Sequence, residues 1–109
     1  MVRFVKGDVV TLPFPFSDLS ATKRRPALVI SDPMGDDVIL CQITASRSDT
    51  YSVQLKRADF AAGSLTQDPS FIRPNKIFTA ETRIVEKKVG SVSAAKYREV
   101  VEKIIGIIS

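Results

Sequence analysis

The chain has 109 residues, of which 44% are hydrophobic and 26% are charged, and its formal net charge is +4. This length suits one domain with a modest core, so we treat residues 1–109 as a single domain, and the composition excludes a disordered chain. The absence of histidine from the sequence excludes Ser-His and Cys-His catalysis and histidine-bound metals. The positive charge favours a polyanionic partner such as nucleic acid or an acidic protein, although it can also serve solubility alone.

The first element in the chain is a short strand. Gly7-Asp8 is a turn signal, and the mostly β-branched, strand-like residues 9–12 follow it. Two prolines lie within 13–16, and each lacks a backbone donor, so we expect this segment to lie outside the sheet. Residues 17–23 are rich in Ser, Asp and Thr and are expected to form a polar loop.

A hairpin and further strands follow the loop. Residues 26–31 and 38–44 are mostly aliphatic and flank a turn at 32–37, which predicts two antiparallel strands. We expect another strand at 52–55 and one or two more within 71–79. The middle of the chain therefore predicts a sheet of short strands.

Two segments differ from these strands. Residues 58–65 are expected to be irregular, with a helical turn that ends at Gly63. The C-terminal segment predicts an amphipathic helix with Ser91 or Ser93 as its N-cap. Its apolar residues recur at helical spacing: Tyr97, Val100, Val101, Ile104, Ile105 and Ile108. The order of elements predicts a mainly β fold, a small curled antiparallel sheet or barrel with a C-terminal helix packed against it.

The sequence gives no sign of a membrane or secreted protein. It has no apolar run of about 18 residues, and Met1 to Asp8 lack the apolar centre and cleavage site of a signal peptide. The single Cys41 cannot form an internal disulfide or a cysteine-based zinc site, and we interpret it as a small core residue rather than a reactive thiol. A cytoplasmic protein is expected.

Three consecutive cations form the first candidate site. Lys23, Arg24 and Arg25 stand immediately before Pro26 and the apolar strand. Because the proline restricts its backbone, Arg25 is the member best suited to bind a phosphate through two parallel hydrogen bonds from its guanidinium. Asp18 could orient this guanidinium. A solvated loop is the alternative interpretation.

Two further groups could share that site. Thr44 ends the third strand and Ser46 follows it, and the hairpin would bring Thr44 to the same rim as Arg25. Hydroxyls in this position can also satisfy local turn groups. Arg73 and Lys76 flank a proline at a bend, where they could extend a basic groove or form an exposed turn. The sequence contains no metal-binding motif or Gly-rich phosphate loop, so we expect no metal or other cofactor.

The ordered set of these motifs resembles the MazF/PemK family of toxins from toxin–antitoxin pairs. The resemblance rests on "GDVVTLPFPFSDLSATKRRPALVIS" followed by "CQITAS", with weaker matches at Gly63–Leu65, in "PSFIRPNKIFT" and in "VGSV", and it spans nearly the whole chain. It implies an SH3-like barrel of the CcdB/MazF type with a C-terminal helix. It also implies a homodimer that inhibits translation by cutting single-stranded RNA, and a cognate antitoxin that binds and inhibits this homodimer.

The resemblance also implies a metal-independent reaction that leaves a 2′,3′-cyclic phosphate and a 5′-hydroxyl. The family's catalytic arginine falls on Arg25, and its hydroxyl partner falls on Thr44. We predict RNA contacts from the surrounding polar residues. These are Ser17, Asp18, Lys23, Arg24, Ser46, Arg73 and Lys76.

Departures from the family pattern leave other functions open. The first loop differs from that of many members, and Asn75 stands near the position where one branch has a catalytic aspartate. A silenced homologue that only binds RNA is one alternative, and a non-enzymatic poison of a protein target, like the gyrase-directed CcdB toxins, is another. Phe14 and Phe16 could form an uncovered apolar patch for dimerisation or fill the end of the barrel.

Overall fold

A computed structural model describes residues 3–15, 22–45 and 49–109. Within these residues, seven strands form one antiparallel sheet in the spatial order β4-β6-β3-β2-β1-β7-β5. The strands are β1 (Asp8–Pro15), β2 (Thr22–Val29), β3 (Asp37–Thr44), β4 (Val53–Leu55), β5 (Phe60–Gly63), β6 (Ser70–Glu81) and β7 (Lys87–Val92). The other elements are the 3₁₀ turns η1 (Arg57–Asp59) and η2 (Thr82–Ile84) and the helix α1 (Ala94–Ile108).

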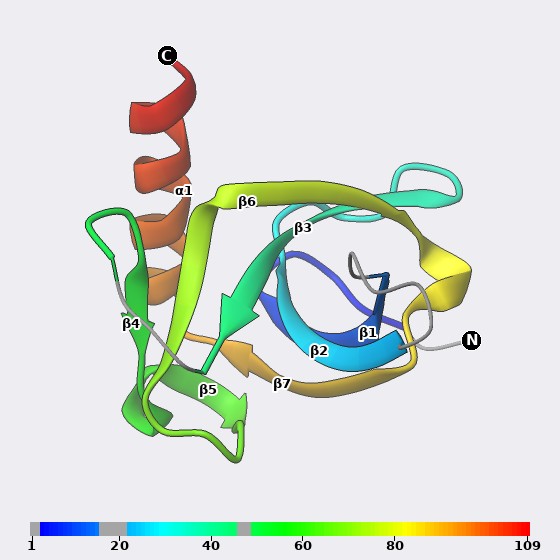
Figure 1. Cartoon of the computed structure of the whole chain (residues 1–109), viewed down its shortest axis with the longest axis horizontal. Helices are drawn as coiled ribbons and strands as arrows, with labels where there is room; N and C mark the ends of the chain where they lie inside the picture. Colours follow the sequence, from blue (N-terminus) through cyan, green and yellow to red (C-terminus); the bar gives the residue numbers. More distant parts are fainter. Residues whose placement is uncertain (1–2, 16–21, 46–48) are drawn as a thin grey trace.

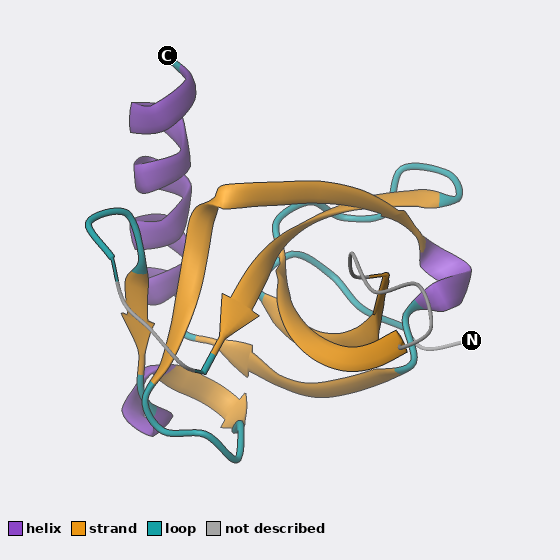
Figure 2. Cartoon of the chain, viewed as in Figure 1, coloured by secondary structure: helices purple, strands orange, loops and turns teal. Residues whose placement is uncertain are grey.

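The sheet curls into a half-barrel, and α1 stands at one end of it, against β6 (Figure 1). Figure 2 shows the strands curving around the body of the molecule, with the helix outside this curve. The arrangement confirms the predicted class, a mainly β fold with a C-terminal helix. Over the described ranges, no helix has the length and apolar character needed to cross a membrane.

Apolar side chains cover both faces of the central strands. Along β2, Leu28 belongs to one cluster, whereas Ala27 and Val29 belong to the other, as the alternation of a strand requires. The first cluster packs against α1 through Val100 and Ile104. The polar side chains of β2 stand in its first half, before Pro26, where the candidate site lies.

β1 runs through the two prolines that we expected outside the sheet, so that prediction is wrong. Pro13 and Pro15 both pair with residues of β2. The N–H of Glu86 donates to the carbonyl oxygen of Thr11, so the backbone polar groups of Thr11 face β7. Pro13 and Pro15 face the same way by strand alternation, but the pairing of β1 with β7 ends at Thr11. Their missing donors therefore face an open edge, where proline is tolerated.

The cations that we expected at the end of a loop lie inside β2, which begins at Thr22. Lys23–Arg25 pair with β1. By the same alternation, the missing donor of Pro26 faces β3, and the pairing with β3 starts just after it, at Ala27. The proline therefore marks the limit of pairing with β3 without interrupting the pairing with β1, so the backbone of Arg25 is fixed by β1.

The late segment forms one strand, β6, and it bends where the sequence predicted a bend. Cys41 pairs with Ile77 and Ile43 pairs with Ile72, so residues 73–76 lie opposite Gln42 alone. The extra residues make an irregularity of the kind that bends a strand, and Figure 1 shows β6 turning sharply along its length. This bend determines where Arg73 and Lys76 point.

The segment at 58–65 is more regular than expected. Its helical turn is η1, and the residues after it form β5, which pairs with β7. We expected no strand at β7. Gly63 has φ +69°, and a Cβ there would lie 2.1 Å from the carbonyl oxygen of Val89, so the close approach of β5 and β7 requires glycine.

α1 begins where the sequence predicted. The Ser93 side chain caps it by accepting the backbone N–H of Lys96 at 3.1 Å. Ile104 is buried, but Ile105 and Ile108 are 52% and 71% exposed. Some apolar residues of α1 therefore lie outside the face that packs against the sheet.

Candidate functional site

Arg25 and Thr44 occupy matching positions on neighbouring strands. The pairs Ala27–Gln42 and Leu28–Cys41 fix the register of β2 and β3. The same register, continued by two residues, sets Arg25 opposite Thr44, which agrees with the expected hairpin. Thr44 is buried and Arg25 is half-buried. The catalytic roles of the two side chains stay predictions.

Three more residues of interest lie on or next to the same face of the sheet. Directly paired residues point to the same face of a sheet, as do residues two apart in one strand. Gln42 therefore lies on the face of Arg25 and Thr44, and the Thr44–Phe71 pair extends that face onto β6. Arg73 follows two residues after Phe71, at the start of the bend of β6 and therefore next to this face.

Arg73 is held at two points. Its Nη2 lies 3.4 Å from Oδ2 of Asp49, and the two side chains are 23% and 31% exposed. Its backbone carbonyl accepts a hydrogen bond from Sγ of Cys41 at 2.8 Å. Burial raises the pKa of the Cys41 thiol to about 12, so the thiol stays protonated and can donate this bond.

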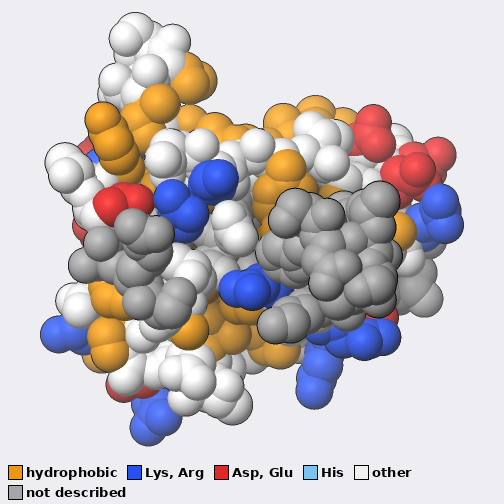
Figure 3. Space-filling view, in the orientation of Figure 1, with side chains coloured by type: hydrophobic (Ala, Val, Ile, Leu, Met, Phe, Trp, Pro, Cys, Tyr) orange, Lys and Arg blue, Asp and Glu red, His pale blue; other side chains and the backbone are white. Residues whose placement is uncertain are grey.

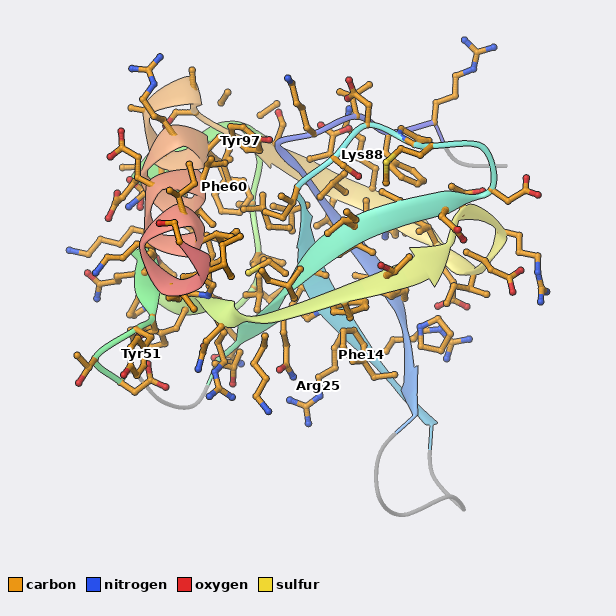
Figure 4. The ribbon with its side chains drawn as sticks, turned by 90° about the horizontal axis from the view of Figure 1, so that it is seen from above. Phe14, Arg25, Tyr51, Phe60, Lys88 and Tyr97 are labelled. Atoms are coloured by element: carbon orange, nitrogen blue, oxygen red, sulfur yellow. The ribbon has the colours of Figure 1, made fainter. Side chains whose placement is uncertain are left out.

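An aromatic cavity of about 550 Å³ opens on this face. Phe14, Phe78, Gln42 and Lys76 contribute to its lining. The rings of Phe14 and Phe78 meet edge to face, with their centroids 5.0 Å apart. Figure 4 shows Phe14 and Arg25 on the side of the molecule away from Lys88 and Tyr97. Phe14 is half-buried and packs against the second core cluster, so it covers part of the sheet end as well as lining the cavity.

The remaining predicted residues are distributed differently. Arg24 points to the opposite face of β2, lines a second cavity of about 430 Å³ and forms an ion pair with Glu86. Lys23 lies in β2 beside β1, whereas Ser17, Asp18, Ser46 and Phe16 lie outside the described residues. Lys76 thus lines the aromatic cavity, whereas Arg25 lines the second cavity together with Arg24. Figure 3 shows lysine and arginine side chains among apolar ones in the middle of this face.

Sequence reasoning missed Asp49 and Phe78 as members of this face. Asp49 reaches Arg73 from 24 positions away, and Phe78 meets Phe14 across the sheet. A turn-forming aspartate and an apolar strand residue are common in any sequence, so only pairing of distant strands could have singled them out. Within the described ranges, no group of three or more His, Cys, Asp or Glu side chains could hold a metal ion.

A family model described as "PemK-like, MazF-like toxin of type II toxin-antitoxin system" matches residues 5–108. The chain belongs to this family. The match includes every described residue of the candidate site, so Arg25 and Thr44 lie within a PemK/MazF-family domain. No curated protein matches the sequence.

Solved structures similar to this PemK/MazF-family chain share its fold at low sequence identity. A MazE–MazF complex (form II) from Deinococcus radiodurans has a TM-score of 0.75 at 19% identity, covering 100% of this chain and 98% of that one. An endoribonuclease from a mycobacterial species has a TM-score of 0.72 at 17% identity, with 97% and 91% covered. A mycobacterial endoribonuclease in complex with its cognate antitoxin has a TM-score of 0.66 at 15% identity, with 98% and 99% covered.

Proposed function

We propose that this toxin-family chain is an endoribonuclease that cuts single-stranded RNA without a metal ion, leaves 2′,3′-cyclic phosphate and 5′-hydroxyl ends, and thereby inhibits translation. The proposal rests on the β2–β3 register, which, if extended by two residues beyond the Ala27–Gln42 pair, sets the half-buried Arg25 opposite the buried Thr44 at one end of the sheet. The nearby aromatic cavity and the cations of β6 suit a single-stranded nucleic acid, whose bases stack on aromatic rings while its phosphates pair with cations.

The reaction requires the 2′-oxygen to attack the adjacent phosphorus in line with the departing 5′-oxygen. Negative charge grows on the non-bridging oxygens as the bond to phosphorus forms. Arg25 neutralises this charge, and Thr44 donates a hydrogen bond to the same phosphoryl group. Preorganised donors of this kind supply a large part of the rate enhancement of many enzymes. The backbone of β2 holds Arg25 in place, so little reorganisation accompanies the reaction.

Proton transfer contributes less in this mechanism. The chain has no histidine, and an arginine with a pKa above about 12 is a poor general base near neutral pH. We therefore assign the catalysis to charge stabilisation and alignment of the phosphate. The proposed reaction uses no group that a metal chelator would remove.

The proposed partners follow from the same face. One structural neighbour is a MazE–MazF complex and another is bound to its cognate antitoxin. For this chain we propose an antitoxin whose acidic or apolar tail lies on the side of the molecule that carries Arg25 and Phe14, in competition with RNA. We also propose a homodimer, in which two such faces offer twice the number of cations to one RNA strand.

Cleavage of a long unstructured RNA in the presence of EDTA tests the proposed activity. The wild type is compared with Arg25→Ala and Thr44→Val, and Arg98→Ala on the exposed side of α1 is the matched control. We expect discrete fragments ending in cyclic phosphate from the wild type and Arg98→Ala. Removal of one preorganised donor typically lowers such a rate by about 10²–10³-fold, which is the loss expected for Arg25→Ala.

Other outcomes would point to the alternative functions. RNA binding without cleavage by the folded wild type would indicate a silenced homologue. Neither binding nor cleavage would favour a poison directed at a protein. Equal activity of Arg25→Ala and the wild type would remove the proposed site.

A further inference from the structure

We propose that Asp49 is a positioning residue that holds Arg73 as a second phosphate-binding cation next to the Arg25–Thr44 site. This inference rests on the proposed function, because it assigns the neighbouring part of the same RNA-binding face. It gives a role to an aspartate that lies outside the motifs of the sequence and that is separated from the first candidate cluster by the whole of β3.

The geometry fixes Asp49 before it meets Arg73. One carboxylate oxygen, Oδ1, accepts the backbone N–H groups of Tyr51 and Ser52, each at 2.9 Å. This bonding pattern closes a turn immediately before β4. The other oxygen, Oδ2, lies 3.4 Å from Nη2 of Arg73. The carboxylate is therefore oriented by the backbone and presents one oxygen to the guanidinium.

Arg73 is limited from the other side as well. Its carbonyl accepts the Cys41 Sγ–H bond, and its side chain emerges at the bend of β6. Within the described part of the chain, Nε of Arg73 is buried and has no hydrogen-bond partner. A buried donor without an acceptor is unfavourable. A ligand would meet the other N–H groups of the guanidinium, since the side chain is 23% exposed.

Phosphate is the ligand that fits this arrangement. A guanidinium has five N–H donors, and a single carboxylate leaves most of them available to an oxyanion. Arg73 also lies two residues after Phe71, which pairs with Thr44, so it stands next to the Arg25–Thr44 site, where the RNA backbone would continue past the scissile phosphate. Asp49 thus restricts the orientation of Arg73 without using all of its donors.

The direction in which Asp49→Asn changes RNA affinity separates this role from a general electrostatic effect. Asp49→Asn removes a negative charge, and charge alone predicts tighter binding of a polyanion. The amide oxygen of asparagine can still accept the two backbone N–H groups, so the turn is retained. If Asp49 positions Arg73, the same substitution weakens binding, because the guanidinium is no longer held toward the RNA.

The experiment measures binding of a mixed-sequence 2′-fluoro RNA oligonucleotide, which lacks the attacking hydroxyl and cannot be cut. The variants are Asp49→Asn, Arg73→Ala and the double variant, with Asp36→Asn in the distant β3 turn as the matched charge control. Affinity is measured over a range of salt concentrations, and thermal unfolding checks that each variant is folded.

We expect Asp49→Asn to weaken binding while Asp36→Asn leaves it equal or tighter. Arg73→Ala should reduce the salt slope by about 0.7, the value for one phosphate contact on a single strand. The effect of Asp49→Asn should disappear in the Arg73→Ala background. A merely structural role would change unfolding but not the salt slope.

Three results would overturn the inference. These are tighter binding by Asp49→Asn, an undiminished effect of that substitution without Arg73, and no oligonucleotide binding by the wild type at low salt. Cleavage of ordinary RNA, measured in parallel, tests the proposed activity separately. If the wild type does not cleave RNA but the variants bind the oligonucleotide as expected, the proposed activity is rejected and the role of Asp49 is retained.

Discussion

Deprotonation of Cys41 should destabilise the folded protein in alkaline solution. Its side chain is fully buried between β3 and β6, and burial raises the pKa of the thiol from its ordinary value of 9.0 to about 12. The folded state therefore keeps the proton while the unfolded chain loses it. Because the unfolded state binds fewer protons above pH 9, the free energy of unfolding falls as pH rises through that interval.

The pKa difference sets the size of the effect. One pKa unit corresponds to about 1.4 kcal/mol, so the thiol contributes a loss of about 3 kcal/mol by pH 11. The contribution is fully present below pH 9 and is lost by pH 12, where the thiol also ionises in the folded state. A loss of this size is a large part of the stability of a small domain.

The assay compares urea unfolding of the wild type and Cys41→Ala from pH 7 to pH 11 under reducing conditions. Other groups, such as Tyr97, titrate in both proteins, so the difference between their unfolding free energies isolates the thiol. We expect the wild type to be more stable at pH 7 and to lose that advantage above pH 9. A difference that stays constant to pH 11 would refute the reasoning, because the thiol would then ionise equally in the folded and unfolded states.

Three structural predictions test the fold around the site, each by urea or thermal unfolding. Gly63→Ala should destabilise the protein by more than about 1 kcal/mol, because it combines a positive φ with a clash against the β7 backbone. Gly106→Ala, which meets open space in α1, should stabilise the protein by up to about 1 kcal/mol. Equal effects of the two substitutions would contradict the β5–β7 contact. Ser93→Ala should cost about 1 kcal/mol through loss of the N-cap, and an unchanged stability would mean that the cap contributes nothing. Ile104→Ala should cost about 2–5 kcal/mol and Ile105→Ala less than about 0.5 kcal/mol, because only Ile104 is buried, and similar losses would show that α1 packs differently.

The local pattern of the sequence was sufficient to predict the strands whose residues are aliphatic or alternate between apolar and polar. The hairpin of β2 and β3 and the capped helix α1 were predicted because each has its own start and stop signals. The prediction for Pro13 and Pro15 failed because the rule for proline depends on which neighbouring strand its missing donor faces. That neighbour is β7, more than 70 residues later in the chain, so no local signal contains the answer.

The candidate site divides in the same way. Arg25 and Thr44 could be predicted because the two strands are joined by a short turn, and the register follows from the turn. Asp49 could not, because its contact with Arg73 depends on the bend of β6, which arises where extra residues lie opposite Gln42. Arg24 was expected beside Arg25; strand alternation sends their side chains to opposite faces of β2, yet both contribute to the lining of the second cavity.

The sequence by itself determined the class of the fold, the position of the helix and the absence of histidine chemistry, since composition, periodicity and capping are properties of adjacent residues. It also indicated the family, through an ordered set of short motifs along the chain. Only the tertiary structure decided which cations share a face, which aromatic rings meet and which carboxylate orients an arginine. These relations depend on strand order and register, which bring together residues that are distant in the chain.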